Sequence, residues 1–192
     1  EVVSVMNYQK GDQDFTAQLT EIISKNPDVL YIPANFAEGA IIMRQARELG
    51  ATFSILGGDA MDNPEMVSIG GDSVEGFSYT SFAYSPNMPE KLMSDIQKQF
   101  TKQWREAYPD KDPAALTGCG YDAYLLIYNA IKNAKSTDPE KITAAIATTK
   151  DMPGVTGTTT INATHDAEKP IGIIRVENGK QVFHAIVDAP AK

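Results

Sequence analysis

Cysteine and histidine are scarce in this sequence of 192 residues, which holds one cysteine, Cys119, and two histidines, His165 and His184. A single cysteine excludes an internal disulfide bond, and no Cys/His cluster has the spacing of metal ligands. Long apolar runs are absent too, because no stretch approaches the roughly 20 apolar residues that span a bilayer. We therefore predict no metal site and no membrane insertion of this segment. The chain opens at Glu1 in a strand-like run, so we expect any targeting segment to lie upstream.

Motifs of the common enzyme classes are also missing. The sequence contains no GxSxG, GxGxxG, Walker A or HExxH pattern. Gly57-Gly58-Asp59 is not a phosphate loop, because no Gly-Lys-Ser/Thr follows it. An α/β enzyme remains an alternative only if His165 or His184 lies in a cleft beside Cys119, and we expect both histidines at the surface. The prediction is a protein that is not an enzyme and that needs no cofactor.

Basic residues are outnumbered in this chain. Seventeen Lys and Arg stand against 25 Asp and Glu, which gives a formal net charge of -8. Binding to nucleic acid requires clustered Lys and Arg that neutralise phosphates, and a polybasic membrane patch requires the same residues. The acidic balance therefore argues against a nucleic-acid partner and against a basic membrane-binding surface.

The first 82 residues alternate between strand and helix patterns. Apolar runs predict four strands, over residues 2–6, 29–32, 53–56 and 76–82. Between them, Phe15 and Leu19 begin a helical apolar stripe, and Asn35 and Glu38 are spaced like a capping box for a helix that ends at Gly50. This β-α-β order predicts an α/β fold with an open parallel sheet, right-handed crossovers and flanking helices.

Helices dominate the next part of the chain. Amphipathic patterns predict helices over residues 89–108 and 115–134, and Asp138-Pro139 begins a third. We interpret Tyr124 and Tyr128, on the apolar side of the second helix, as core residues. Helices with apolar faces need a sheet to cover, and this chain supplies none for them. We therefore interpret the chain as one portion of a longer protein.

The end of the chain returns to strands. Residues 171–176 and 181–187 flank Glu177-Asn178-Gly179-Lys180. Asn-Gly between two alternating runs is a strong signal for a two-residue hairpin turn. We predict a C-terminal β-hairpin.

A ligand site is expected at the carboxyl ends of the parallel strands, where open α/β sheets bind ligands. That rule selects three loops, at residues 7–14, 33–38 and 57–63. Asp59 projects a carboxylate there, a good partner for a ligand ammonium group, while Phe36 and Asn35 could supply an apolar wall and a polar contact. The alternative is that Asp59 only caps a turn or helix near Met61, and position alone leaves both interpretations open.

Several ordered segments resemble the periplasmic binding proteins for branched-chain amino acids, the leucine/isoleucine/valine-binding type. Each is short, but together they follow the family's order from one end of the chain to the other. They are Gly11–Leu19, Asn26–Leu30, Met43–Gly50, Gly120–Tyr124 and Thr156–Asp166. The resemblance implies two α/β lobes joined by three crossover strands, with the N-terminal half of the full protein absent.

The resemblance also implies a division of the chain and a set of binding residues. Residues 1–82 would form the second lobe, residues 83–167 the helical part of the first lobe, and residues 168–192 a hairpin that returns to the second lobe. Asp59 matches the acidic position that binds the ligand α-ammonium group, where the family has the longer Glu. Asn35 and Phe36 align with a loop that carries two aromatic residues in the family and one here. Thr117 and Cys119 bound the segment that reaches the ligand side chain.

The function implied is that of an extracytoplasmic substrate-binding component of an ABC transporter. It would bind an amino acid of the branched-chain type, or a similar small amide, between the two lobes and deliver it to a membrane permease. The expected location is the periplasm, or the outer face of the cell membrane through a lipid anchor. The alternative is a ligand-sensing domain of a receptor or regulator with the same fold.

Overall fold

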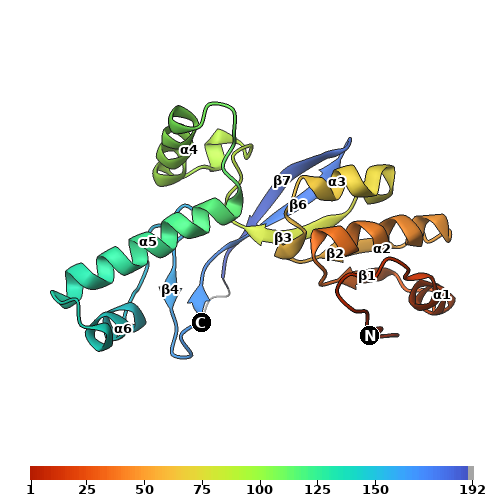
Figure 1. Ribbon diagram of the computed structural model, residues 1–192, viewed down its shortest axis with the longest axis horizontal. Helices are drawn as coiled ribbons and strands as arrows, with labels where there is room; N and C mark the ends of the chain where they lie inside the picture. The colour runs from red at the N-terminus through yellow and green to blue at the C-terminus, as the bar shows by residue number, and fades with distance from the viewer. Residues whose placement is uncertain (190–192) are drawn as a thin grey trace. The chain divides into compact units, whose positions relative to one another are not determined.

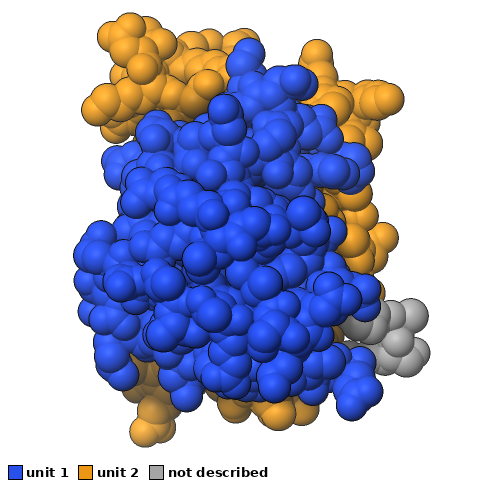
Figure 2. Space-filling model, turned by 90° about the vertical axis from the view of Figure 1, so that its right-hand side faces the viewer, with its two compact units in different colours: residues 1–81, 174–184 blue, residues 82–173, 185–192 orange. Residues whose placement is uncertain are grey.

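A computed structural model describes residues 1–189 of the chain and divides them into two compact units. The first unit contains Glu1–Ser81 and Ile174–His184, and the second contains Phe82–Ile173 and the residues from Ala185 onward (Figure 2). The chain therefore passes between the units three times, after Ser81, after Ile173 and after His184.

A five-stranded sheet in the order β1-β2-β3-β6-β7 organises the first unit (Figure 1). Strand β1 pairs in parallel with β2, from Val29↔Ser54 to Ile32↔Gly57, and β2 pairs in parallel with β3. The predicted α/β class with a mostly parallel sheet and flanking helices is confirmed. The strands are β1 (Val29–Ile32), β2 (Ser54–Gly57), β3 (Ser78–Phe82), β6 (Ile171–Glu177) and β7 (Lys180–Val187).

The core of the first unit lies between this sheet and its helices, α1 (Thr16–Ser24), α2 (Phe36–Glu48) and α3 (Glu65–Gly70). On α2, Ala40, Met43 and Ala46 are fully buried, at the i, i+3 and i+6 spacing of one helix face. From α1 and the residue before it, Leu19 and Phe15 are both 2% exposed. Burial of these apolar side chains is the main force that holds the helices on the sheet.

The predicted strand over residues 2–6 is wrong. These residues form no strand in the described part of the chain, and Val2, Val3 and Val5 are 78, 52 and 75% exposed. Valine favours extended backbone, but a strand also requires a neighbouring strand that satisfies its N–H and C=O groups. An apolar run indicates only the first of these two conditions.

The second unit contains the helices α4 (Asp95–Ala107), α5 (Ala115–Ala134) and α6 (Pro139–Ala147), with a two-stranded sheet of β4 (Thr160–Ile161) and β5 (Ala167–Glu168) (Figure 1). Helix α6 begins as predicted, because Asp138 accepts hydrogen bonds from the Glu140 and Lys141 amides. Helix α4 begins later than predicted. A capping box of Ser94 and Gln97 fixes its start, and residues 90–92 form a separate 3-10 turn.

Buried polar contacts hold the second unit together. Asp122 of α5 is 5% exposed and accepts hydrogen bonds from the amides of Val155 and Thr156, at 2.6 and 2.8 Å. Gln97 of α4 donates through its amide nitrogen to the carbonyl oxygens of Ala83 and Val155, both at 2.8 Å. The 155–156 turn is therefore attached to two helices at once.

Helix α5 carries an exposed apolar face. Leu116, Tyr124, Ile127 and Tyr128 are 67, 64, 50 and 51% exposed, and the rings of Tyr124 and Tyr128 stack on each other at 6.2 Å between centroids. The interpretation of Tyr124 and Tyr128 as core residues is therefore wrong for this chain. Nothing in residues 1–189 covers this face of α5. The sequence predicted helices whose apolar faces have no sheet to cover within this chain.

The C-terminal hairpin forms as predicted. Asn178 and Gly179, between β6 and β7, have φ angles of +53° and +70°. Positive φ at both central residues is the property of a type I′ turn, whose twist matches that of the flanking strands. The turn is anchored to the rest of the unit by Glu75, whose carboxylate accepts hydrogen bonds from the amides of both residues, at 2.9 and 3.2 Å.

Candidate ligand-binding site

The carboxyl ends of β1 and β2 lie at the same edge of the sheet. Ile32, the last residue of β1, is paired with Gly57, the last residue of β2. Asn35 and Phe36 follow β1, and Asp59 follows β2, so the structure brings these three predicted residues to one edge of the first unit. Loops at this edge are where α/β sheets bind ligands.

Asp59 is the first residue of a 3-10 turn, Asp59–Met61, and its side chain is exposed. The turn has no side-chain cap, and Asp59 caps neither this turn nor α3, where the Asn63 side chain accepts a hydrogen bond from the Glu65 amide. Within the described residues no group donates a hydrogen bond to the Asp59 carboxylate. The capping alternative is therefore not formed, and the carboxylate is available to an external cation.

The buried side chain of Met61 fixes the position of this turn. Its side chain is fully buried and wedged between α2 and β2. A β-carbon at position 39 would lie 2.5 Å from the Met61 Sδ atom, and one at position 57 would lie 3.1 Å from Met61 Cγ and 2.6 Å from the Phe77 ring. Gly39 and Gly57 therefore provide the space that Met61 occupies, which holds Asp59 at the strand end.

Asp62 fixes the other end of the turn. Its carboxylate accepts a hydrogen bond from Ser81 Oγ at 2.5 Å and another from Tyr79 Oη at 3.1 Å. Both donors stand on the same face of β3, two residues apart. Burial, and then the negative charge of Asp62, raise the pKa of the Tyr79 phenol well above its ordinary value. The phenol is therefore a hydrogen-bond donor throughout the neutral range.

Sequence reasoning missed Asp62 and its two donors. The only available signal was the alternation in β3, which places Tyr79 and Ser81 on one face. A polar pair on one face of a buried strand indicates a polar partner, but the partner lies 17 and 19 residues earlier in the chain. Its identity requires the three-dimensional structure.

Asn35 and Phe36 begin α2 without the predicted capping box. Asn35 occupies the N-cap position, but its side chain makes no cap hydrogen bond. Glu38, the expected partner, is instead 7% exposed and accepts a hydrogen bond from the Gly11 amide at 3.1 Å. This contact attaches the predicted 7–14 loop to α2. Glu38 does not form the capping box because its carboxylate accepts a hydrogen bond from the amide of Gly11, in a loop 27 residues earlier in the chain.

Thr117 and Cys119 lie in the first turns of α5 and belong to the second unit. Both are partly exposed. Gly118 between them is buried against the 155–156 turn, where a β-carbon would lie 2.9 Å from Val155 and 3.0 Å from Thr156. The predicted site residues are thus divided, with Asn35, Phe36 and Asp59 in one unit and Thr117 and Cys119 in the other.

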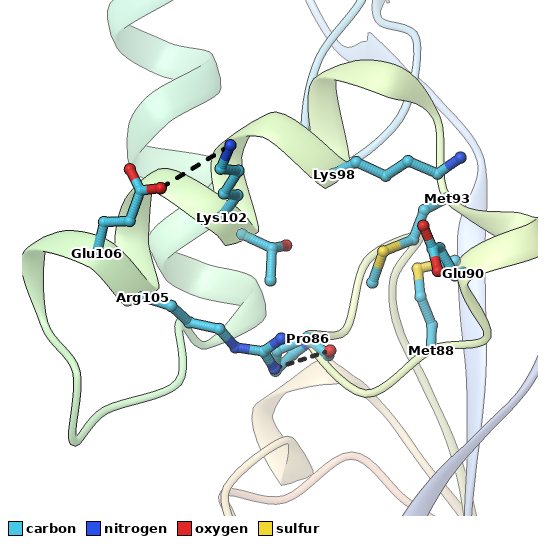
Figure 3. A pocket seen from close by; sticks show the side chains of 9 residues that line it. Pro86, Met88, Glu90, Met93, Lys98, Lys102, Arg105 and Glu106 are labelled. Atoms are coloured by element: carbon cyan, nitrogen blue, oxygen red, sulfur yellow. Dashed lines mark hydrogen bonds and ion pairs between the residues drawn. The ribbon is translucent and has the colours of Figure 1, made fainter.

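A hollow on the second unit contains none of the predicted residues (Figure 3). Two of its cations already have acceptors. Lys102 lies 3.9 Å from the Glu106 carboxylate, and Arg105 donates to the Asp112 carboxylate at 2.8 Å and to the Pro86 carbonyl at 3.4 Å. Between residues 1 and 189 no group of three or more His, Cys, Asp and Glu side chains could hold a metal ion. In the same range, no helix combines the length and the apolar character required to cross a bilayer.

A sequence profile of the family described as periplasmic binding protein matches residues 1–181. This chain belongs to the periplasmic binding protein family. Among curated relatives, a Leu/Ile/Val-binding protein, BraC3 of Rhizobium johnstonii, is 31% identical over 176 residues, which cover 90% of this chain and 45% of the relative. A Leu/Ile/Val-binding protein homolog of Brucella melitensis has the same identity and coverage.

Solved periplasmic binding proteins share the fold. The leucine-binding protein LivK of Thermotoga maritima superimposes with a TM-score of 0.85 at 41% identity, covering 94% of this chain and 50% of that one. LivJ of Streptococcus pneumoniae, a branched-chain amino acid transporter substrate-binding protein in complex with isoleucine, gives a TM-score of 0.76 at 28% identity, covering 95% and 50%. The chain spans about half the length of the relatives that it matches.

Proposed function

We propose that this chain is part of the substrate-binding component of an ABC transporter and that it contributes one side of a site for an amino acid of the branched-chain type or a similar small amide. The observation that carries the proposal is the Asp59 carboxylate, which is exposed and has no hydrogen-bond partner in residues 1–189. Buried anchors hold its turn at the carboxyl edge of the sheet. The names of the relatives, which bind leucine, isoleucine and valine, support the ligand class.

The chemistry follows from charge and shape. An amino-acid ammonium group would gain charge-assisted hydrogen bonds from this carboxylate. These bonds would strengthen once closure of the lobes on the ligand excludes water from the exposed Asp59 side chain. Phe36 offers an apolar surface to an aliphatic side chain, and Asn35 a polar group beside it. Thr117 and Cys119 would contact the ligand from the second unit. Because no covalent step is involved, the ligand acts by stabilising a closed form of the two lobes over an open one.

The lobes are assigned on the same basis. Residues 1–82 and the hairpin within 168–192 would form one lobe, and residues 83–167 the helical part of the other. The division of the chain at Ser81, Ile174 and His184 into two compact units supports this assignment. We further propose an extracytoplasmic location, in the periplasm or at the outer face of the cell membrane through a lipid anchor, and a membrane permease of the ABC type as the protein partner.

Titration of the full-length protein with leucine, isoleucine and valine in a calorimeter tests the proposal. We expect Asp59→Ala to weaken binding by roughly 2–5 kcal/mol, as for removal of one partner of a desolvated charge pair. Asp72→Ala is the matched control, because Asp72 is an exposed carboxylate of the same unit that lies in the separate turn Gly71–Val74. Equal affinities for the wild type and Asp59→Ala would contradict the assignment of Asp59.

A further inference from the structure

The turn that carries Asp59 is hydrogen-bonded to two of the strands through which the chain leaves the first unit. Asp62 accepts hydrogen bonds from Tyr79 and Ser81 of β3, and Ser81 is the last residue of the unit on that strand. From β7, Gln181 donates to the Asn63 carbonyl at 3.1 Å, three residues before the chain leaves the unit at His184.

The contact between Asp62 and Ser81 is the strongest of these. A hydroxyl donor and an ionised acceptor make a charge-assisted bond, and 2.5 Å is at the short end for such bonds. Ser81 is 3% exposed and Asp62 is partly buried, so water competes little for either group. Met61, fully buried between Asp59 and Asp62, makes the turn a stiff connection rather than a loose loop.

We propose that Asp62 and Ser81 form a positioning pair, which ties the Asp59 turn to β3 at the point where that strand leaves the unit. Neither residue needs to contact the ligand. The pair holds the Asp59 carboxylate in register with the strand end, and it makes any displacement of the turn on ligand binding a displacement of β3 as well. This inference rests on the proposed function, since it names how the same site is positioned.

Removal of the Ser81 hydroxyl tests the pair in the full-length protein. We expect Ser81→Ala to weaken leucine binding about tenfold, because the turn is then no longer tied to β3 and the Asp59 carboxylate is displaced from its position at the strand end. Ser81→Thr keeps a hydroxyl at this position of the strand, so its affinity for leucine should stay within about threefold of the wild type. Asp62→Ala combined with Ser81→Ala should weaken binding no more than Asp62→Ala alone, because the two residues act as one unit.

Hydrogen exchange of the amides of residues 58–63 provides a second measurement that does not depend on the ligand. Ser81→Ala should lower their protection, Ser81→Thr should restore it, and Asp72→Asn should leave it unchanged. If Asp59→Ala abolishes leucine binding while Ser81→Ala binds normally and keeps full protection, the positioning pair is refuted and the proposed function stands. If the wild type binds none of leucine, isoleucine and valine, the proposed function fails, and unchanged exchange in Ser81→Ala would independently refute the pair.

Discussion

The Lys169 ammonium nitrogen lies 3.9 Å from the buried carboxylate of Asp122. The same ammonium donates to the Thr156 hydroxyl, which in turn donates to the Asp122 carboxylate. The three side chains therefore form one closed polar cluster in the second unit. Because both backbone amides of the 155–156 turn also donate to Asp122, this carboxylate is the common acceptor of the cluster.

Loss of that acceptor is expected to destabilise the fold. Asp122→Ala would leave two buried amides and the Thr156 hydroxyl without their acceptor, and the Lys169 ammonium without its counter-ion. We therefore expect the free energy of unfolding of the full-length protein to fall by about 3–5 kcal/mol. Urea unfolding measures the change. Glu106→Ala is the control, since the Lys102–Glu106 pair has side chains 77 and 64% exposed and should change stability by no more than about 1 kcal/mol. Equal effects of the two substitutions would contradict the role of Asp122.

Two helical glycines should respond in opposite directions to alanine. Gly39→Ala places a methyl group against Met61, so we expect a loss of about 1–3 kcal/mol of stability from overpacking. Gly120, on α5, has open space where a β-carbon would lie, with nothing within 4 Å, so Gly120→Ala should stabilise by about 0.5–1 kcal/mol through helix propensity. Thermal unfolding compares them. Gly39→Ala should also weaken leucine binding, because it displaces the turn that carries Asp59.

Tyr79 makes the first unit sensitive to alkaline pH. Its pKa is raised in the folded state, so above about pH 10 the unfolded chain loses the phenolic proton while the folded chain retains it. Stability is therefore full below pH 10 and falls above it, by up to about 1.4 kcal/mol per pH unit. Tyr79→Phe should flatten this decline. The control is Tyr31→Phe, which should not flatten it, because the Tyr31 side chain is 59% exposed. Melting temperatures from pH 8 to 11 measure both, and identical slopes would contradict the prediction.

The apolar face of α5 should behave differently in the two forms of the protein. In the isolated 192-residue chain Tyr124 is 64% exposed, so Tyr124→Glu should change stability by less than about 0.5 kcal/mol. If residues outside this chain cover the face in the full-length protein, the same substitution should cost about 1–3 kcal/mol there, because it buries a carboxylate. Urea unfolding of both forms provides the comparison. A small effect in both would show that the face stays exposed.

Local signals predicted much of the fold. The bounds 115–134 match α5, because a long apolar stripe dominates that helix, and Asp138-Pro139 caps α6 because its partners are two and three residues away. The Asn178-Gly179 hairpin follows from the positive φ that its turn requires. Local signals failed where the outcome depended on distant parts of the chain. Residues 2–6 form no strand because no neighbouring strand among residues 1–189 pairs with them. Glu38 accepts a hydrogen bond from Gly11 instead of capping its helix.

In the candidate site, too, local signals predicted some features and missed those that depend on distant residues. Asp59 could be placed at the sheet edge from chain order alone, since any loop after a parallel strand arrives there. What holds it could not be predicted, because Met61 depends on the absence of side chains at positions 39 and 57, and Asp62 depends on donors from β3. The ligand contacts of Asn35, Phe36, Asp59, Thr117 and Cys119 remain predictions.

Strands β6 and β7 have a consequence for synthesis on the ribosome. They complete the sheet begun by β1, β2 and β3, and the Gly76 amide donates to the carbonyl of Val176, one hundred residues later. By the time that partner leaves the exit tunnel, all of residues 82–173 have already emerged. The first unit therefore finishes after the segment inserted within it, and until then its open sheet edge is exposed to chaperones and to aggregation.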